Sequence, residues 1–173
     1  MTPVFERALG SAFDTLDACV RAVHRERGTR RYAGEVEVER GLHPLAALCA
    51  WATRLPPAGR GPIEVEIAAG AADERWSRRV GTHVMRSRLW ERDGLLHERL
   101  GAVTFVFRLR AHAGAIEWTV ERVRALGLPL PSRWFAAVGA REAACDGRYT
   151  FDVRAALPRV GLLVRYRGWL DVG

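Results

Sequence analysis

The tripeptide HER at positions 97–99 carries residue types that exchange protons and bind anions. In an extended chain successive side chains point to opposite faces, so His97 and Glu98 cannot share a face. If the strand runs without interruption to Phe105 and Phe107, His97 lies on their face of the sheet. A bulge at Gly101 would reverse this phase and bring Glu98 inward.

A carboxylate that faces an apolar interior needs a partner or a raised pKa, because an unpaired buried charge is costly. Arg78 is the natural partner of Glu98, since its segment is expected to form the neighbouring strand. Arg86 or Arg88 could also reach this carboxylate. In an apolar cavity Glu98 would act as a general acid or base, and Arg78 would orient an anionic or carbonyl ligand. The alternative is a structural pair that only braces a curved sheet.

Two tyrosines fall on the apolar face of the last alternating segments: Tyr149 in phase with Phe151, and Tyr166 in phase with Val164. A buried phenol usually finds a hydrogen-bond partner. In a solid core each hydroxyl would meet a backbone group or Glu98, whereas in a hollow interior both would orient a ligand. The candidate ligand-binding residues are Trp76, Arg86, His97, Phe105, Phe107, Trp118, Tyr149 and Tyr166, with Glu98 and Arg78 as the candidate catalytic pair.

Strands must position most of these side chains, because apolar and polar residues alternate with a period of two through most of the chain. Before them, residues 3–25 repeat apolar residues at three- and four-residue steps, which predicts an amphipathic helix. A second helix is expected after His43, which would cap it, with Leu45, Leu48 and Cys49 in its apolar stripe. The predicted strands are 31–40, 62–70, 75–91, 95–111, 116–127, 135–145, 148–157 and 160–170.

These elements predict an α+β fold in a single domain, residues 1–173. About seven antiparallel strands must bury their apolar faces together, and glycines inside the long segments indicate bends or bulges. We therefore expect a strongly curved antiparallel sheet or a β-barrel, with the N-terminal helix and the second helix packed at one side. Barrels of this kind often enclose a cavity. The internal glycines are Gly81, Gly101, Gly139 and Gly168.

The formal net charge is +7, and all 27 basic residues are arginine because lysine does not occur. This excludes Schiff-base catalysis and a nucleotide-binding P-loop, which both need lysine. The arginines alternate with glutamates and form no basic block, so we expect no nucleic-acid partner.

Several other classes of function are disfavoured. No glycine-rich dinucleotide or nucleophile-elbow motif is present, and the histidines and three cysteines lack metal-ligand spacing, so we expect no cofactor and no metal site. No apolar run approaches the roughly 20 residues that a membrane-spanning helix needs. Without a secretory signal at the start, the cytoplasm is the expected location.

The ordered motifs FERALGSAF, WSRRVG, ERLGAVTFVFRL, LGLPLPS and YTFDV…GLLVRYRGWL extend over nearly the whole chain. This set resembles a bacterial family of unknown function, whose members occur alone or behind a saccharopine-dehydrogenase-like or short-chain-dehydrogenase-like NAD-binding domain. Glu98 matches the family pattern, which favours the bulge that turns it inward. Where the family usually has an aromatic residue, this chain has Val80, which implies a roomier or differently shaped pocket.

These observations favour a barrel that binds a small, mostly apolar organic molecule, with Glu98 as acid or base and Arg78 as anchor. Isomerisation, cyclisation or hydrolysis without a cofactor would suit these groups. The resemblance implies an alternative, in which the chain is a non-catalytic partner of a separately encoded NAD-binding oxidoreductase.

Overall fold

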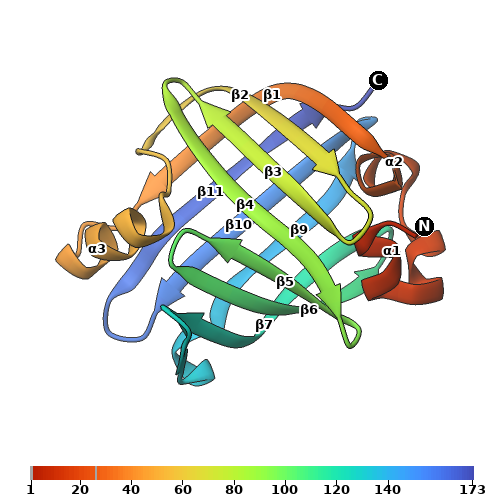
Figure 1. Cartoon of the computed structure of the whole chain (residues 1–173). Coiled ribbons are helices and arrows are strands. Elements are labelled where there is room, and N and C mark those ends of the chain that lie inside the picture. The colour runs from red at the N-terminus through yellow and green to blue at the C-terminus, as the bar shows by residue number, and fades with distance from the viewer. Residues whose placement is uncertain (1, 26) are drawn as a thin grey trace.

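The computed structural model describes residues 2–25 and 27–173, and most of this length is β-strand. A closed barrel is formed because the first strand of the chain also pairs with the last (Figure 1). The strands are β1 (Gly28–Arg40), β2 (Gly59–Ala69), β3 (Asp73–Val80), β4 (His83–Arg92), β5 (Leu95–Leu100), β6 (Val103–His112), β7 (Ala115–Ala125), β8 (Leu128–Leu130), β9 (Ala137–Cys145), β10 (Arg148–Leu157) and β11 (Gly161–Asp171).

All strand pairings in the described residues are antiparallel. Ten strands follow one another around the barrel, and β7 pairs directly with β9 because the three-residue β8 lies beside the end of β7. Register shifts at Val106/Phe107 and Ala155/Ala156 provide local irregularities in the curved sheet. The predicted α+β barrel is confirmed, with more strands than the seven or so expected.

Two segments that alternation predicted as single long strands are hairpins. Gly81 and Gly101 adopt positive φ angles of 57° and 54° in two-residue turns, which divide 75–91 into β3 and β4 and 95–111 into β5 and β6. The prediction of a bulge at Gly101 was therefore wrong, because this glycine lies in the turn between β5 and β6. Its consequence for Glu98 holds, because cross-strand partners share a face and Glu98 pairs with Phe105.

The predicted helix over residues 3–25 is broken into α1 (Val4–Leu9), a 3₁₀ segment (Gly10–Thr15) and α2 (Ala18–Arg25). The break follows from the backbone: Gly10 has φ 58°, and Leu16 is extended. The amide of Asp17 then donates to the Gly114 carbonyl in the β6–β7 turn. The apolar stripe of residues 3–25 is nevertheless largely buried, as the amphipathic pattern predicted, and the segment closes one end of the barrel.

The second helix, α3 (Pro44–Thr53), lies at the opposite end of the barrel from α1 and α2 (Figure 1). His43 caps it as expected, since its Nδ1 accepts from the Leu45 amide at 3.2 Å. The predicted stripe of Leu45, Leu48 and Cys49 borders the interior of the barrel, although Leu45 and Leu48 stay about half exposed. The side chains of Ala46 and Ala50 in this helix are buried. None of the helices in the described residues is long and apolar enough to cross a membrane.

Candidate functional site

A cavity of about 460 Å³ occupies the barrel interior. Known small-molecule sites occupy roughly 300–1,000 Å³, so a small organic molecule fits this volume. Leu45, Leu48 and Trp134 line the cavity and are each about half exposed, so it reaches the surface beside α3. The two ends of the barrel thus differ: one is filled by helices and the other is open.

Aromatic rings fill the barrel at its closed end. Phe5 of α1 is fully buried and stacks on His24 of α2, with ring centroids 3.7 Å apart. Its ring also lies 5.5 Å from Trp118 and 6.0 Å from Trp76, and both indoles line the cavity. The helical segment therefore provides the floor of the cavity by packing its own rings against those of the strands.

Arg78 and Glu98 face the cavity from β3 and β5. Their side chains are 11% and 8% exposed, and Arg78 Nη2 lies 3.4 Å from Glu98 Oε1. Arg78 also donates from Nη1 to the Ser87 hydroxyl at 2.9 Å, and its guanidinium lies 4.7 Å from the Trp76 ring centroid. Arg78 is thus held by Glu98, Ser87 and Trp76, and both members of the pair line the cavity with further hydrogen-bonding capacity.

The two predicted tyrosines also line the cavity. Burial raises the pKa of Tyr166 to about 12, although the nearby Arg78 guanidinium lowers it in part. Burial raises the pKa of Tyr149 well above its ordinary value, and both the charge of Glu142 and a hydrogen bond to it act in the same direction. Both phenols therefore keep their protons at neutral pH and serve as hydrogen-bond donors.

Sequence reasoning missed Glu142, which faces the cavity floor from β9. It is buried, and its Oε2 lies 2.6 Å from His24 Nε2. The Glu142 carboxylate therefore interacts with both His24 and the Tyr149 phenol. The available signal was the alternation of β9, which places Glu142 in phase with Val138 and Ala140.

Glu74 is a second buried carboxylate that sequence reasoning missed, in phase with Trp76 and Arg78 on β3. Its Oε2 accepts from the Trp76 indole at 2.9 Å. Burial raises the pKa of Glu74, and this shift is opposed by His24, by the Trp76 bond and by the Val4 amide. Glu74 therefore ties α1 and an aromatic wall residue to the start of β3.

We expect Glu74→Gln to flatten the pH dependence of stability above the ordinary carboxyl pKa of 4.5. Between the pKa values of the unfolded and folded states, only the folded state retains the proton, so stability falls as pH rises. Below both values this loss is absent. Glutamine does not ionise and keeps an acceptor for Trp76. The difference in free energy of unfolding between Glu74→Gln and the wild type, measured by urea denaturation, should therefore change with pH between these two pKa values. Glu64→Gln, at an exposed site on β2, is the control, and parallel curves for Glu74→Gln and the wild type would refute the expectation.

Eight of the ten candidate residues line the cavity. The two that do not are His97 and Arg86. His97 lies on the outer face because the turn at residues 101–102 sets Glu98 inward, and it stacks on Trp90 at 5.2 Å between ring centroids. Burial and nearby arginines lower the pKa of His97. Arg86 is exposed on β4 and lines an outer hollow of about 980 Å³ instead.

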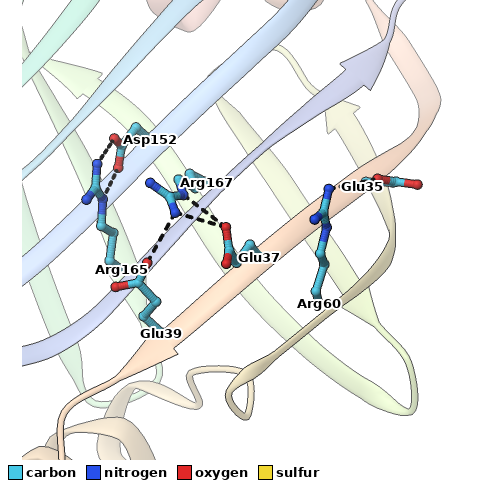
Figure 2. Close-up of polar contacts among 7 residues, drawn as sticks. All are labelled: Glu35, Glu37, Glu39, Arg60, Asp152, Arg165 and Arg167. Carbon is cyan, nitrogen blue, oxygen red and sulfur yellow. Dashed lines mark hydrogen bonds and ion pairs between the residues drawn. The ribbon is translucent and has the colours of Figure 1, made fainter.

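The outer face of β1, β10 and β11 is crossed by ion pairs, as Figure 2 shows. Arg165 binds both carboxylate oxygens of Asp152, at 3.0 and 2.6 Å, and this bond lowers the pKa of the aspartate. Arg167 bridges Glu37 at 3.0 Å and Glu39 at 3.5 Å. These pairs line a shallow outer hollow of about 800 Å³. Because most of the charges drawn there are paired with one another, this face is a weaker candidate site than the interior.

The interior combines carboxylates, the Arg78 guanidinium and protonated phenols inside an aromatic wall. Such a set can orient a polar group of an otherwise apolar ligand and can exchange a proton with it. Within residues 2–25 and 27–173, no three histidine, cysteine or acidic side chains are grouped so that they could hold a metal ion.

Comparison with known proteins identifies the sequence family. No curated protein matches the chain. Residues 16–170 match the family described as a domain of unknown function (DUF4166). This range begins in the helical segment and runs through the whole barrel to β11, so it includes every cavity-lining strand. The chain therefore belongs to the DUF4166 family.

Proposed function

We propose that the barrel binds a small, mostly apolar organic molecule in its interior cavity. The observation that carries this proposal is the cavity of about 460 Å³, whose aromatic and aliphatic wall surrounds a few convergent polar groups. Arg78 and Tyr166 would hold the polar end of the ligand, because both present N–H or O–H donors to the cavity.

Acid–base chemistry on the bound molecule is the more specific part of the proposal. Glu98 would take or give a proton while the Arg78 guanidinium stabilises negative charge on the ligand. A reaction of this kind, such as an isomerisation, cyclisation or hydrolysis, needs no redox cofactor. Turnover by the purified protein without nicotinamide, lost in Glu98→Gln with the fold intact, would support this step.

The test of binding is to fill the cavity without changing the surface. Ala155 of β10 lines the cavity, whereas Ala33 of β1 is exposed on the outside. We expect Ala155→Trp to weaken binding of an apolar fluorescent probe, 1-anilinonaphthalene-8-sulfonate, by at least roughly tenfold, because the indole occupies the ligand volume. Ala33→Trp should bind like the wild type, and thermal unfolding should show that both variants remain folded.

Native mass spectrometry of the freshly purified protein provides an independent check. A retained organic mass that disappears on denaturation, and that is missing from Ala155→Trp, would identify the ligand class. Equal probe binding by Ala155→Trp and the wild type would refute the cavity as the site. A protein that binds nothing in this cavity but alters the kinetics of a separately encoded NAD-dependent oxidoreductase would support the partner-module alternative instead.

A further inference from the structure

The open end of the barrel carries exposed apolar side chains. Among the described residues, every large apolar side chain that is strongly exposed lies in the connections at this end, either around α3 or between β7 and β9. Trp51 is 78% exposed and Leu126 is 83% exposed. Contiguous exposed apolar groups mark interaction sites more often than single ones do. This apolar rim consists of Leu42, Leu45, Leu48, Trp51, Leu126, Leu128 and Trp134.

Helix α3 is apolar on all sides, which is unusual for a surface helix. Its sequence, PLAALCAWAT, contains no charged residue. Ala46 and Ala50 are buried, whereas Leu45, Leu48 and Trp51 are about half exposed or more. Leu45 and Leu48 lie at the mouth of the cavity. The exposed side chains are therefore the larger apolar groups, and burial of α3 against the barrel does not account for them.

The charge at this end is exclusively positive. No aspartate or glutamate occurs in the connections 41–58, 81–82, 101–102, 126–136 and 158–160, which together form the open end. The closed end differs, with Asp17, Asp93 and Asp146 in or beside its turns. The closed end thus carries both signs of charge, since Arg21 and Arg25 also lie there, whereas the connections of the open end carry only positive charge.

The arginines of the open end also lack carboxylate partners. Arg54, Arg124, Arg133 and Arg159 are exposed, and none of them forms an ion pair within the part of the chain that the structure describes. On the outer face of β11, by contrast, Arg165 and Arg167 are both paired with carboxylates (Figure 2). Guanidinium groups without ion pairs, beside exposed leucine and tryptophan, suit an occupant that is both apolar and anionic.

We propose that the open end of the barrel docks onto the surface of an anionic lipid bilayer. Leu48, Trp51 and Trp134 would lie among the headgroups and upper acyl chains, where indoles are favoured. Arg54, Arg133 and Arg159 would contact lipid phosphates and carboxylates. The cavity opens within this same surface, so an apolar ligand could pass between bilayer and barrel without crossing water; this last step alone rests on the proposed function.

Two other occupants fit the rim less well. A second copy of the chain would bring arginines against arginines, because a twofold interface apposes the same patch on both subunits and this patch has no acidic residue. A nucleic acid would match the charge but would leave the exposed leucines in contact with phosphate or water. A bilayer offers acyl chains to the leucines and anionic headgroups to the arginines.

Co-sedimentation with vesicles tests the docking. We expect the wild type to bind vesicles in which roughly a third of the phosphatidylcholine is replaced by phosphatidylserine at least tenfold more tightly than phosphatidylcholine alone, with weakening at high salt. The triple variant Arg54→Glu/Arg133→Glu/Arg159→Glu and the double variant Leu48→Ser/Trp51→Ser should each lose at least roughly tenfold in affinity for the anionic vesicles.

The matched control is Arg75→Glu/Arg92→Glu/Arg110→Glu, which changes the net charge equally at exposed sites away from the rim. This control should keep most of the wild-type binding. Equal losses in the two triple variants would show attraction by net charge alone and would overturn the docking surface. Absence of vesicle binding would also overturn the docking surface. The same conclusion would follow if the rim bound duplex DNA or a second copy of the chain instead of vesicles.

The docking and the proposed function fail separately in these experiments. Ala155→Trp fills the cavity but leaves the rim unchanged, so it should bind anionic vesicles like the wild type. Normal docking together with unaltered probe binding by Ala155→Trp would refute the cavity and leave the docking surface standing. Probe binding that Ala155→Trp abolishes, with no vesicle binding by the wild type, would refute the docking surface alone.

Discussion

Arg78→Met is expected to lower the free energy of unfolding by about 3–5 kcal/mol, because it leaves a buried carboxylate without its counter-ion. Glu98 is only 8% exposed and has Arg78 as its charged partner at 3.4 Å. Methionine retains much of the apolar stem of arginine, so the loss would report the missing charge and hydrogen bonds rather than a void. Urea denaturation followed by far-ultraviolet circular dichroism measures it.

The double variant Arg78→Met/Glu98→Leu is the control for this prediction. Removing both charges together should recover most of the lost stability, because well-packed apolar residues replace a buried ion pair at little cost. The stable double variant should still bind the apolar probe more weakly than the wild type if the pair anchors a ligand. A change below about 1 kcal/mol in Arg78→Met would mean that water in the cavity solvates Glu98, and that the pair does not brace the barrel.

Phe5→Ala should also cost about 3–5 kcal/mol, since it removes a fully buried ring from the floor of the cavity. The ring stacks on His24 and lies beside Trp76 and Trp118, so the aromatic contacts of three elements are lost at once. Thermal and urea unfolding would both shift to less stable values. The variant should also release α1 from the barrel, which limited proteolysis would detect as faster cleavage.

Leu42→Ala provides the matched comparison, because it truncates an apolar side chain that is fully exposed. Its stability should stay within about 0.5 kcal/mol of the wild type. If Phe5→Ala were equally mild, the helical segment would not be what seals this end of the barrel, and the cavity would need another floor.

Alternation in the sequence was enough to predict a curved antiparallel sheet but not the number of its strands. A glycine within an alternating run can mark either a bulge or a two-residue turn, and both reverse the phase of the apolar residues across the glycine, so alternation alone does not distinguish them. Gly81 and Gly101 lie in turns, because the segments on either side of each glycine pair with each other as antiparallel strands. Gly168 and Gly139 lie within strands, where an added Cβ would meet the backbone oxygens of Glu35 and Trp118.

The resemblance to the family, rather than the phase of the strand, favoured an inward Glu98, and phase then supplied much of the rest of the candidate site. Once Glu98 was placed inward, Arg78, Tyr149 and Tyr166 shared the interior with it, because each lies on the apolar face of its own strand. The contact between His24 and Glu142 could not be predicted in this way, since it joins residues 118 positions apart on a helix and a strand. Periodicity likewise identified α3 but not which of its side chains are buried, because both faces are apolar.

The pairing of β1 with β11 sets the order in which this protein can be completed during synthesis. Glu37 and Arg167 are neighbours across that pairing although 130 residues separate them along the chain. Until β11 has left the ribosome, β1 must wait with one edge unpaired, and an unpaired edge invites association with other chains. The late closure also gives the barrel many long-range contacts, which predicts slow folding. A circular permutant that places β11 directly before β1 would turn this last step into a local hairpin, and should fold faster with less aggregation.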